Sequence, residues 1–83
     1  MLHKQQIDPE TQRWDALFTK ITSLLKNNYN AFAHVYTKRQ FNKHLDIYLT
    51  EVGETGELEV YENTNDEGLL HDFWQYIQGE LQG

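Results

Sequence analysis

Residues 44–62 alternate between apolar and polar side chains, and a segment bounded by Gly53 and Gly56 interrupts the alternation. Alternation of this kind is typical of half-buried strands, and glycines at both ends of a short segment favour a turn. If the loop has an even number of residues, one face collects the apolar side chains Leu45, Ile47, Leu49, Leu58 and Val60. The pattern therefore predicts a β-hairpin whose other, solvated face places Tyr48 opposite Tyr61.

A further strand is predicted just before the hairpin. Aromatic or histidine side chains occupy every second position in the middle of residues 31–37, although Phe32, Val35 and Tyr36 are also spaced as in a short helix. We interpret the segment as the first of three antiparallel strands, joined to the hairpin through residues 38–43. Either of its faces could be buried, so the aromatic side chains could complete the core or extend the tyrosine surface.

A first helix is predicted over residues 9–27. Asp8 is a residue type that caps helices, and Pro9 suits the first helical turn. The apolar residues recur at steps of three and four and form one stripe, which consists of Trp14, Leu17, Phe18, Ile21, Leu24 and Leu25. Asn27 and Asn28 accept left-handed backbone, so we expect the helix to end there.

A second helix is predicted after a polar turn over residues 63–68. Thr64 and Glu67 have the spacing of a capping box. The apolar stripe of this helix consists of Leu69, Leu70, Phe73, Trp74, Ile77 and Leu81. Each predicted helix carries one tryptophan, and we expect both Trp14 and Trp74 in the core because each belongs to an apolar stripe.

These elements predict one α+β domain over residues 1–83, in the order α-β-β-β-α, with both amphipathic helices packed on one face of a three-stranded antiparallel sheet. The order resembles that of the double-stranded-RNA-binding domain. The resemblance implies phosphate binding by lysines at the start of the last helix, whereas residues 65–68 here read Asn-Asp-Glu-Gly. We therefore expect no direct contact with nucleic acid, and a small regulatory domain of this topology stays an alternative.

Composition limits the chain to a few classes. A chain of 83 residues can bury only about 60 to 65% of the surface that it exposes when unfolded, so its core is small. The absence of cysteine excludes a disulfide framework and a thiolate metal site. No apolar run approaches the roughly 20 residues of a membrane span, and the first residues lack the apolar centre of a signal peptide. We expect a cytoplasmic protein that does not contact membranes.

Charge is distributed unevenly along the chain. Residues 1–43 hold all seven basic residues and three acidic ones, a net charge of plus four, whereas residues 44–83 hold ten acidic residues and no Lys or Arg. Solubility requires a net charge but not such a separation, so the two halves indicate a directed electrostatic field. The opposite signs also allow two copies to associate, which makes a homodimer a further alternative.

Catalysis is the less favoured interpretation. The candidate catalytic or metal-binding side chains are acids beside the histidines His3, His34, His44 and His71. Neither His44 with Asp46 nor His71 with Asp72 has a spacing that is diagnostic of a metal or acid–base site. A zinc-protease helix motif, a nucleophile elbow and a glycine-rich phosphate loop are all absent from the sequence. We expect no enzyme, no metal and no cofactor, and a metal-dependent enzyme using His and Asp is kept as an unfavoured alternative.

The favoured function is binding to a basic protein surface through acids that surround two tyrosines. Tyrosines supply contact area and carboxylates steer the partner, and the predicted partner-binding residues are Asp46, Tyr48, Glu54, Glu57, Glu59, Tyr61, Asp66 and Glu67. Many basic protein surfaces bind nucleic acid. Phage-borne inhibitors and bacterial immunity proteins of similar size and charge occupy such surfaces as nucleic-acid mimics, and this analogy predicts a non-catalytic inhibitor or immunity-type protein.

Overall fold

The computed structural model describes residues 8–34 and 36–82, and throughout these residues the regular elements are helices. They are α1 (Pro9–Asn27), the single 3₁₀ turn η1 (Tyr29–Ala31), α2 (Lys38–Thr55), α3 (Leu58–Glu62) and α4 (Asp66–Gln82). These residues contain no strand. The predicted α+β fold with a three-stranded sheet is therefore wrong, and the protein is a small all-α fold.

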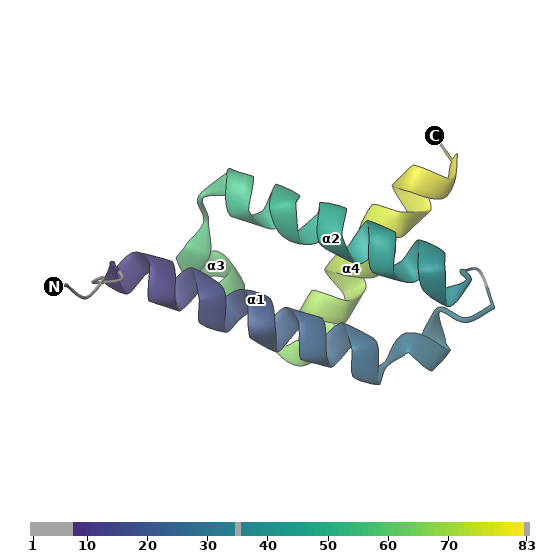
Figure 1. Cartoon of the computed structure of the whole chain (residues 1–83), viewed down its shortest axis with the longest axis horizontal. Helices are drawn as coiled ribbons and strands as arrows, with labels where there is room; N and C mark the ends of the chain where they lie inside the picture. Colours follow the sequence, from purple (N-terminus) through teal and green to yellow (C-terminus); the bar gives the residue numbers. More distant parts are fainter. Residues whose placement is uncertain (1–7, 35, 83) are drawn as a thin grey trace, which may run out of the picture.

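The helices form an elongated molecule of 51 × 25 × 24 Å. α1 and α2 run antiparallel and are joined through η1, while α4 crosses this pair obliquely (Figure 1). The short α3 lies beside α1, near the end of the molecule where α1 begins (Figure 1). As a result, the two ends of the long axis are built from different parts of the chain.

The first predicted strand of the hairpin belongs to α2. Thr37 and Gln40 form a capping box, in which the Gln40 N–H donates to the Thr37 hydroxyl at 3.2 Å and the Thr37 N–H donates to the Gln40 side-chain oxygen at 3.2 Å. The buried residues of α2 recur at steps of four and three, namely Phe41, Leu45, Tyr48 and Val52. This helical stripe overrides the shorter alternation, and it leaves Ile47 exposed on the opposite side.

The two glycines that indicated a hairpin turn serve the end of α2 instead. Gly56 has a φ of 71° and ends the helix in left-handed backbone, a conformation that is costly for other residues. Gly53 lies within the last turns of α2, where a Cβ would approach Cζ of Phe18 at 3.2 Å. A missing side chain therefore allows α1 and α2 to approach closely at this point.

The other two predicted strands are also helical or turn segments. Between η1 and α2, Phe32 and Tyr36 are both buried, and the Tyr36 N–H donates to the Phe32 carbonyl at 3.0 Å, so this segment turns with a four-residue step. His34 is exposed, which settles which side chains face inward. Residues 58–62 form α3, in which Leu58 is buried and Val60 is exposed.

The two predicted helices are present. α1 begins at Pro9 and ends at Asn27 as expected, although the Asp8 side chain makes no capping hydrogen bond. The expected left-handed backbone is absent at this end, because the capping residue Asn28 has a φ of −111°. At the start of α4 the cap is Asn65, whose side-chain oxygen accepts from the Gly68 N–H at 2.8 Å. The predicted capping box is wrong, because the Thr64 hydroxyl donates backwards to the Val60 carbonyl at 2.7 Å.

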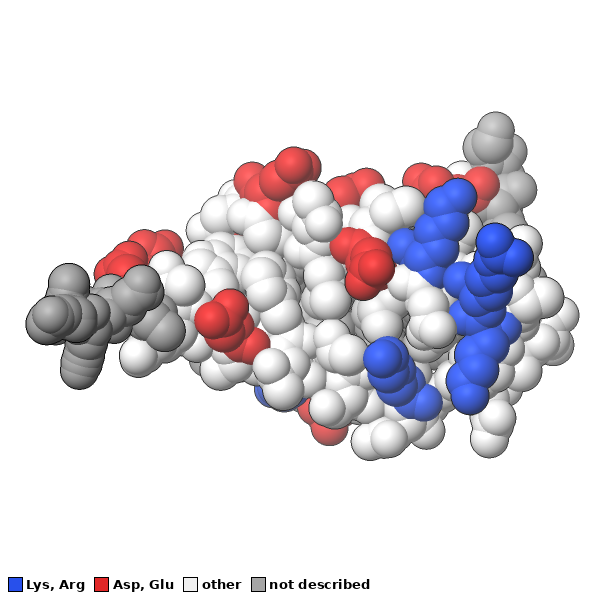
Figure 2. Space-filling model, in the orientation of Figure 1, with Lys and Arg blue, Asp and Glu red and all other residues white. Residues whose placement is uncertain are grey.

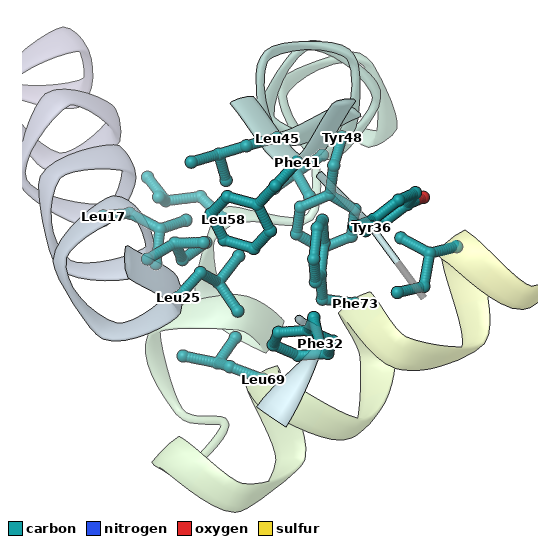
Figure 3. Packing of buried hydrophobic residues seen from close by; sticks show 13 residues of the cluster. Leu17, Leu25, Phe32, Tyr36, Phe41, Leu45, Tyr48, Leu58, Leu69 and Phe73 are labelled. Carbon is teal, nitrogen blue, oxygen red and sulfur yellow. The ribbon is translucent and has the colours of Figure 1, made fainter. Parts of the chain in front are cut away.

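The core is built around aromatic rings from three parts of the chain. Phe73 of α4 is fully buried, and its ring contacts those of Phe32, Phe41 and Tyr48 with centroid distances of 5.4, 5.8 and 5.1 Å. All three contacts are edge-on, the arrangement that aromatic pairs prefer (Figure 3). Both tryptophans are half-buried and pack against this core from its margin.

Replacement of Phe73 by alanine tests the central role of this ring. We expect Phe73→Ala to lower the free energy of unfolding by about 3–5 kcal/mol, because it removes a large buried side chain and leaves a cavity. The control is Val60→Ala, which changes a side chain that is 58% exposed and should alter stability by less than about 0.5 kcal/mol. Urea unfolding followed by circular dichroism measures both, and equal effects would contradict the described core.

Two glycine substitutions test the local backbone of the helices. Gly56→Ala should lower the free energy of unfolding by about 1–2 kcal/mol, because alanine is strained at a φ of 71°. Gly79→Ala should raise it by about 0.5–1 kcal/mol, because Gly79 lies in α4 with open space around its Cβ position. Urea unfolding followed by circular dichroism measures both changes. A strand signal in the spectrum of the folded protein would contradict the helix that ends at Gly56.

Candidate binding pocket

A pocket of about 290 Å³ lies between α2, α3 and α4, and we call it the tyrosine pocket. Its lining combines three tyrosines with two carboxylates, and the full set is Tyr48, Glu51, Val52, Thr55, Tyr61, Asp72, Gln75 and Tyr76. Carboxylates and several aromatic side chains therefore line one hollow.

Helical spacing explains why these residues meet. Tyr48 and Glu51 belong to α2, and with Val52 and Thr55 they follow steps that place them on one face of that helix. Asp72 and Tyr76 lie four residues apart on the facing side of α4. Tyr61 of α3 closes the third side of the pocket.

One hydrogen bond fixes the floor of the pocket. The Tyr48 hydroxyl donates to Oδ2 of Asp72 at 2.5 Å, across the α2–α4 contact. Tyr48 is only 3% exposed and its ring packs against Phe73, so the core holds this side chain in place. Asp72 is thereby oriented toward the pocket by a charge-assisted hydrogen bond.

The pocket disfavours additional negative charge. The pKa values of Tyr48, Tyr61 and Tyr76 are all raised, in each case mainly by burial. Neighbouring carboxylates raise them further: Asp72 acts on Tyr48 and Tyr61, and Glu80 and Glu51 act on Tyr76. Burial opposes a charge of either sign, whereas the contribution of the carboxylates opposes ionisation of a phenol and attracts a cation.

Three buried polar atoms have no hydrogen-bond partner among residues 8–34 and 36–82, namely the hydroxyls of Tyr36 and Tyr76 and Nδ1 of His44. They belong to neighbouring rings, since the His44 ring lies 5.2 Å from Tyr36 and 6.3 Å from Tyr76 between centroids. Buried polar groups are nearly always paired in folded proteins. The Tyr76 hydroxyl therefore belongs to a small buried cluster with unused hydrogen-bonding capacity behind the wall of the tyrosine pocket.

The predicted partner-binding residues do not form one surface. Tyr48 and Tyr61 both line the tyrosine pocket, although Tyr48 is buried and not on a solvated face. Asp46 and Glu54 line a separate groove between α1 and α2, and Glu57 and Glu59 line a depression that Arg13 also borders. Asp66 and Glu67 are exposed in the first turn of α4.

Sequence patterns missed part of the pocket. Glu51, Gln75 and Tyr76 belong to it only because α2 and α4 face each other, and Asp72 is conspicuous in the sequence solely as a neighbour of His71. A signal was present in the helical steps from Tyr48 to Glu51 and from Asp72 to Tyr76. It becomes visible only when residues 38–55 are assigned to a helix.

The histidine and acid pairs do not assemble a metal site in the described part of the chain. His44 is half-buried on α2, whereas Asp46 is exposed, because residues two apart on a helix point in different directions. His71 is exposed while Asp72 lines the tyrosine pocket. Within the described ranges no three His, Cys, Asp or Glu side chains are placed to hold a metal ion, and His3 lies outside them.

Comparison with protein-family models, with curated proteins and with solved structures finds no match for this chain. Of the described helices, none combines the length and the apolar character that crossing a bilayer requires.

The raised tyrosine pKa values predict a loss of stability at alkaline pH. Burial, assisted by Tyr76 and Glu80, raises the pKa of Tyr36 from 10.0 to about 12. The folded state therefore holds this proton more tightly than the unfolded chain, so its stabilising effect is complete below pH 10 and is lost between pH 10 and about 12. Tyr48, Tyr61 and Tyr76 act in the same direction.

Urea unfolding at a series of pH values between about 8 and 11 measures this loss, since tyrosine ordinarily titrates near 10. Tyr36→Phe should show a shallower decline above pH 10, because the variant lacks one of the ionisable groups. A decline of equal steepness in the variant would contradict the burial of that hydroxyl.

Proposed function

We propose that this chain is a non-catalytic binding protein whose tyrosine pocket receives a cationic side chain from a basic segment of another protein. The observation that carries the proposal is the convergence of three tyrosines and two carboxylates in one hollow. Aromatic faces attract cations, and carboxylates pair with them, so this lining is complementary to lysine or arginine.

The pocket suits a long cationic side chain better than a free inorganic cation. Val52 and the rings of Tyr61 and Tyr76 form apolar and aromatic walls. Such walls can pack against the methylene groups of a lysine or arginine side chain. Asp72 is fixed by Tyr48, and Glu51 is exposed at the margin, so one carboxylate is preorganised and the other is adjustable. Such a pocket supplies an anchor for one residue of a partner.

The acids around the pocket favour the approach of a basic partner. Glu57 contributes to the raised pKa of Tyr61, and Glu51 and Glu80 contribute to that of Tyr76, so their charge is felt within the pocket. Of the cations that could neutralise this region, Arg13 is engaged in an ion pair with Glu62. Uncompensated carboxylates at an interface raise association rates with basic partners.

The more specific hypothesis from sequence, an inhibitor or immunity-type protein that occupies the basic site of a nucleic-acid-binding protein, is compatible with this pocket. A partner of that class presents many lysines and arginines on one surface. The tyrosine pocket would hold one of them while the neighbouring acids pair with others. The proposal thus keeps the predicted partner and relocates the contact from a sheet face to the junction of three helices.

The direct test is titration with a short arginine-rich peptide at low ionic strength, followed by calorimetry and by the chemical shifts of the tyrosine rings. We expect Glu51→Gln with Asp72→Asn to weaken binding by about tenfold or more, equivalent to at least about 1.4 kcal/mol. Asp72→Asn keeps an acceptor for the Tyr48 hydroxyl, so the fold should persist.

The matched control is Asp46→Asn with Glu54→Gln, which removes the same charge from the α1–α2 groove. It should weaken binding only slightly, because exposed charges outside the contact act through a screened field. Equal weakening in both variants would mean that the peptide senses net charge and not the pocket. Capture of a basic protein from lysate by the wild type, lost in the pocket variant, would then identify the partner.

A further inference from the structure

A second charged surface lies at the end of the molecule where α1 ends and α2 begins, and we call it the basic end. It comprises Lys26 in the last turn of α1 with Lys38, Arg39 and Lys43 in the first turns of α2. Figure 2 shows Lys and Arg side chains gathered over this end of the long axis. Residues 16–45, which build it, contain no aspartate or glutamate.

Two of these positions oppose the electrostatics of their own helix. Lys38 and Arg39 occupy the first turn of α2, where the helix dipole is positive and where α2 has no acidic residue. α4 shows the favourable arrangement, with Asp66 and Glu67 in its first turn. Arg39 and Lys43 also repel each other, because residues four apart share a helix face. Local choices that oppose stability indicate a functional requirement.

The basic end is hollowed, and the hollow has an aromatic floor. A cleft of about 300 Å³ is lined by Lys26, Tyr29, Lys38, Phe41 and Asn42. Nζ of Lys38 lies 5.8 Å from the centroid of the Tyr29 ring. That ring is held in place, because its hydroxyl donates to the Tyr36 carbonyl at 3.0 Å. The ring also packs edge-on with Phe41, with 5.0 Å between the two ring centroids. Rigid aromatic surface, two ammonium groups and an amide therefore converge.

We propose that the basic end binds the phosphate backbone of single-stranded nucleic acid, with Lys26, Lys38 and Arg39 on phosphates and Tyr29 as a surface for a base or sugar. Cationic grooves with aromatic platforms bind single strands in this way, with little dependence on sequence. The inference is independent of the tyrosine pocket, which shares α2 with the basic end but none of the residues that line its cleft. It departs from the expectation of no direct contact with nucleic acid, which treated residues 38–43 as a loop.

An anionic membrane is the less fitting occupant. Surface binding to lipid combines basic residues with apolar side chains that insert between headgroups. Among the described residues the exposed large apolar side chains are Ile47 and Val60, and both lie outside the basic end, Val60 on α3 at the other end of the molecule. The basic end offers cations and a recessed aromatic ring. A single nucleic-acid strand with its phosphates along the rim of the cleft matches both features.

The test is fluorescence anisotropy of a labelled single-stranded oligothymidylate with the full chain, repeated over a range of salt concentrations. Each phosphate contact contributes about −0.7 to the slope of log K against log salt for single strands. Lys38→Gln with Arg39→Gln should therefore weaken binding at least about tenfold at low salt and reduce the slope by about 1.4. The variant should fold at least as stably as the wild type, because it removes cations from the start of α2, which thermal unfolding checks.

The control is Lys20→Gln, which removes an exposed cation of α1 that does not line the cleft. It should leave the slope unchanged. Absence of binding at low salt, or equal weakening in both variants, would overturn the proposal. If the protein binds phosphatidylserine vesicles but not the oligonucleotide, the surface is assigned to lipid. If it does not bind the oligonucleotide but self-associates in a salt-sensitive way that the Lys38/Arg39 variant loses, the surface is assigned to a second copy. Either result would overturn it.

Discussion

The contact of Phe73 with Phe32, Phe41 and Tyr48 is the constraint on which the rest of the molecule depends. A chain of this length buries little surface, so a few large side chains must supply most of the stabilisation that offsets the loss of conformational entropy. Aromatic rings supply large area with few rotatable bonds. By bringing α4 against α2 and the segment after η1, this cluster also creates the walls of the tyrosine pocket.

The antiparallel arrangement of α1 and α2 converts a charge pattern along the chain into a charge pattern in space. Lys26, Lys38, Arg39 and Lys43 flank the connection between these helices, so they gather at one end of a 51 Å molecule. Acids of α2, α3 and the first turn of α4 lie along the remainder, where Arg13 and Glu62 form an ion pair between α1 and α3. Glu80, near the end of α4, is the exception, because it lies close enough to Tyr36 to raise the pKa of that residue. Since the Debye length is about 8 Å at physiological ionic strength, the two ends act nearly independently.

The terminal helices could be predicted because their apolar stripes have no competing period. The middle of the chain could not, because Leu45, Ile47 and Leu49 fit a strand while Phe41, Leu45 and Tyr48 fit a helix, and intrinsic preferences separate the two by only a few tenths of a kcal/mol per residue. The decisive signals were the capping box of Thr37 and Gln40 and the left-handed Gly56, which bound the whole segment 38–55. Among the pocket residues, the sequence pattern indicates Tyr48 and Tyr61, although as a pair facing each other across two strands. Glu51 and Tyr76 can be placed in the pocket only when the packing of α2 against α4 is known.

Tyr48 belongs to the core and to the pocket at once, since its ring contacts Phe73 and its hydroxyl holds Asp72. Changes at this residue that alter ligand preference therefore also alter folding, which leaves few tolerated substitutions. The pocket residues Glu51 and Gln75 are exposed, so they can change without removing a side chain from the core. Divergence in specificity among proteins of this fold would accordingly accumulate at the rim, while the floor of the pocket would be retained for the sake of the fold.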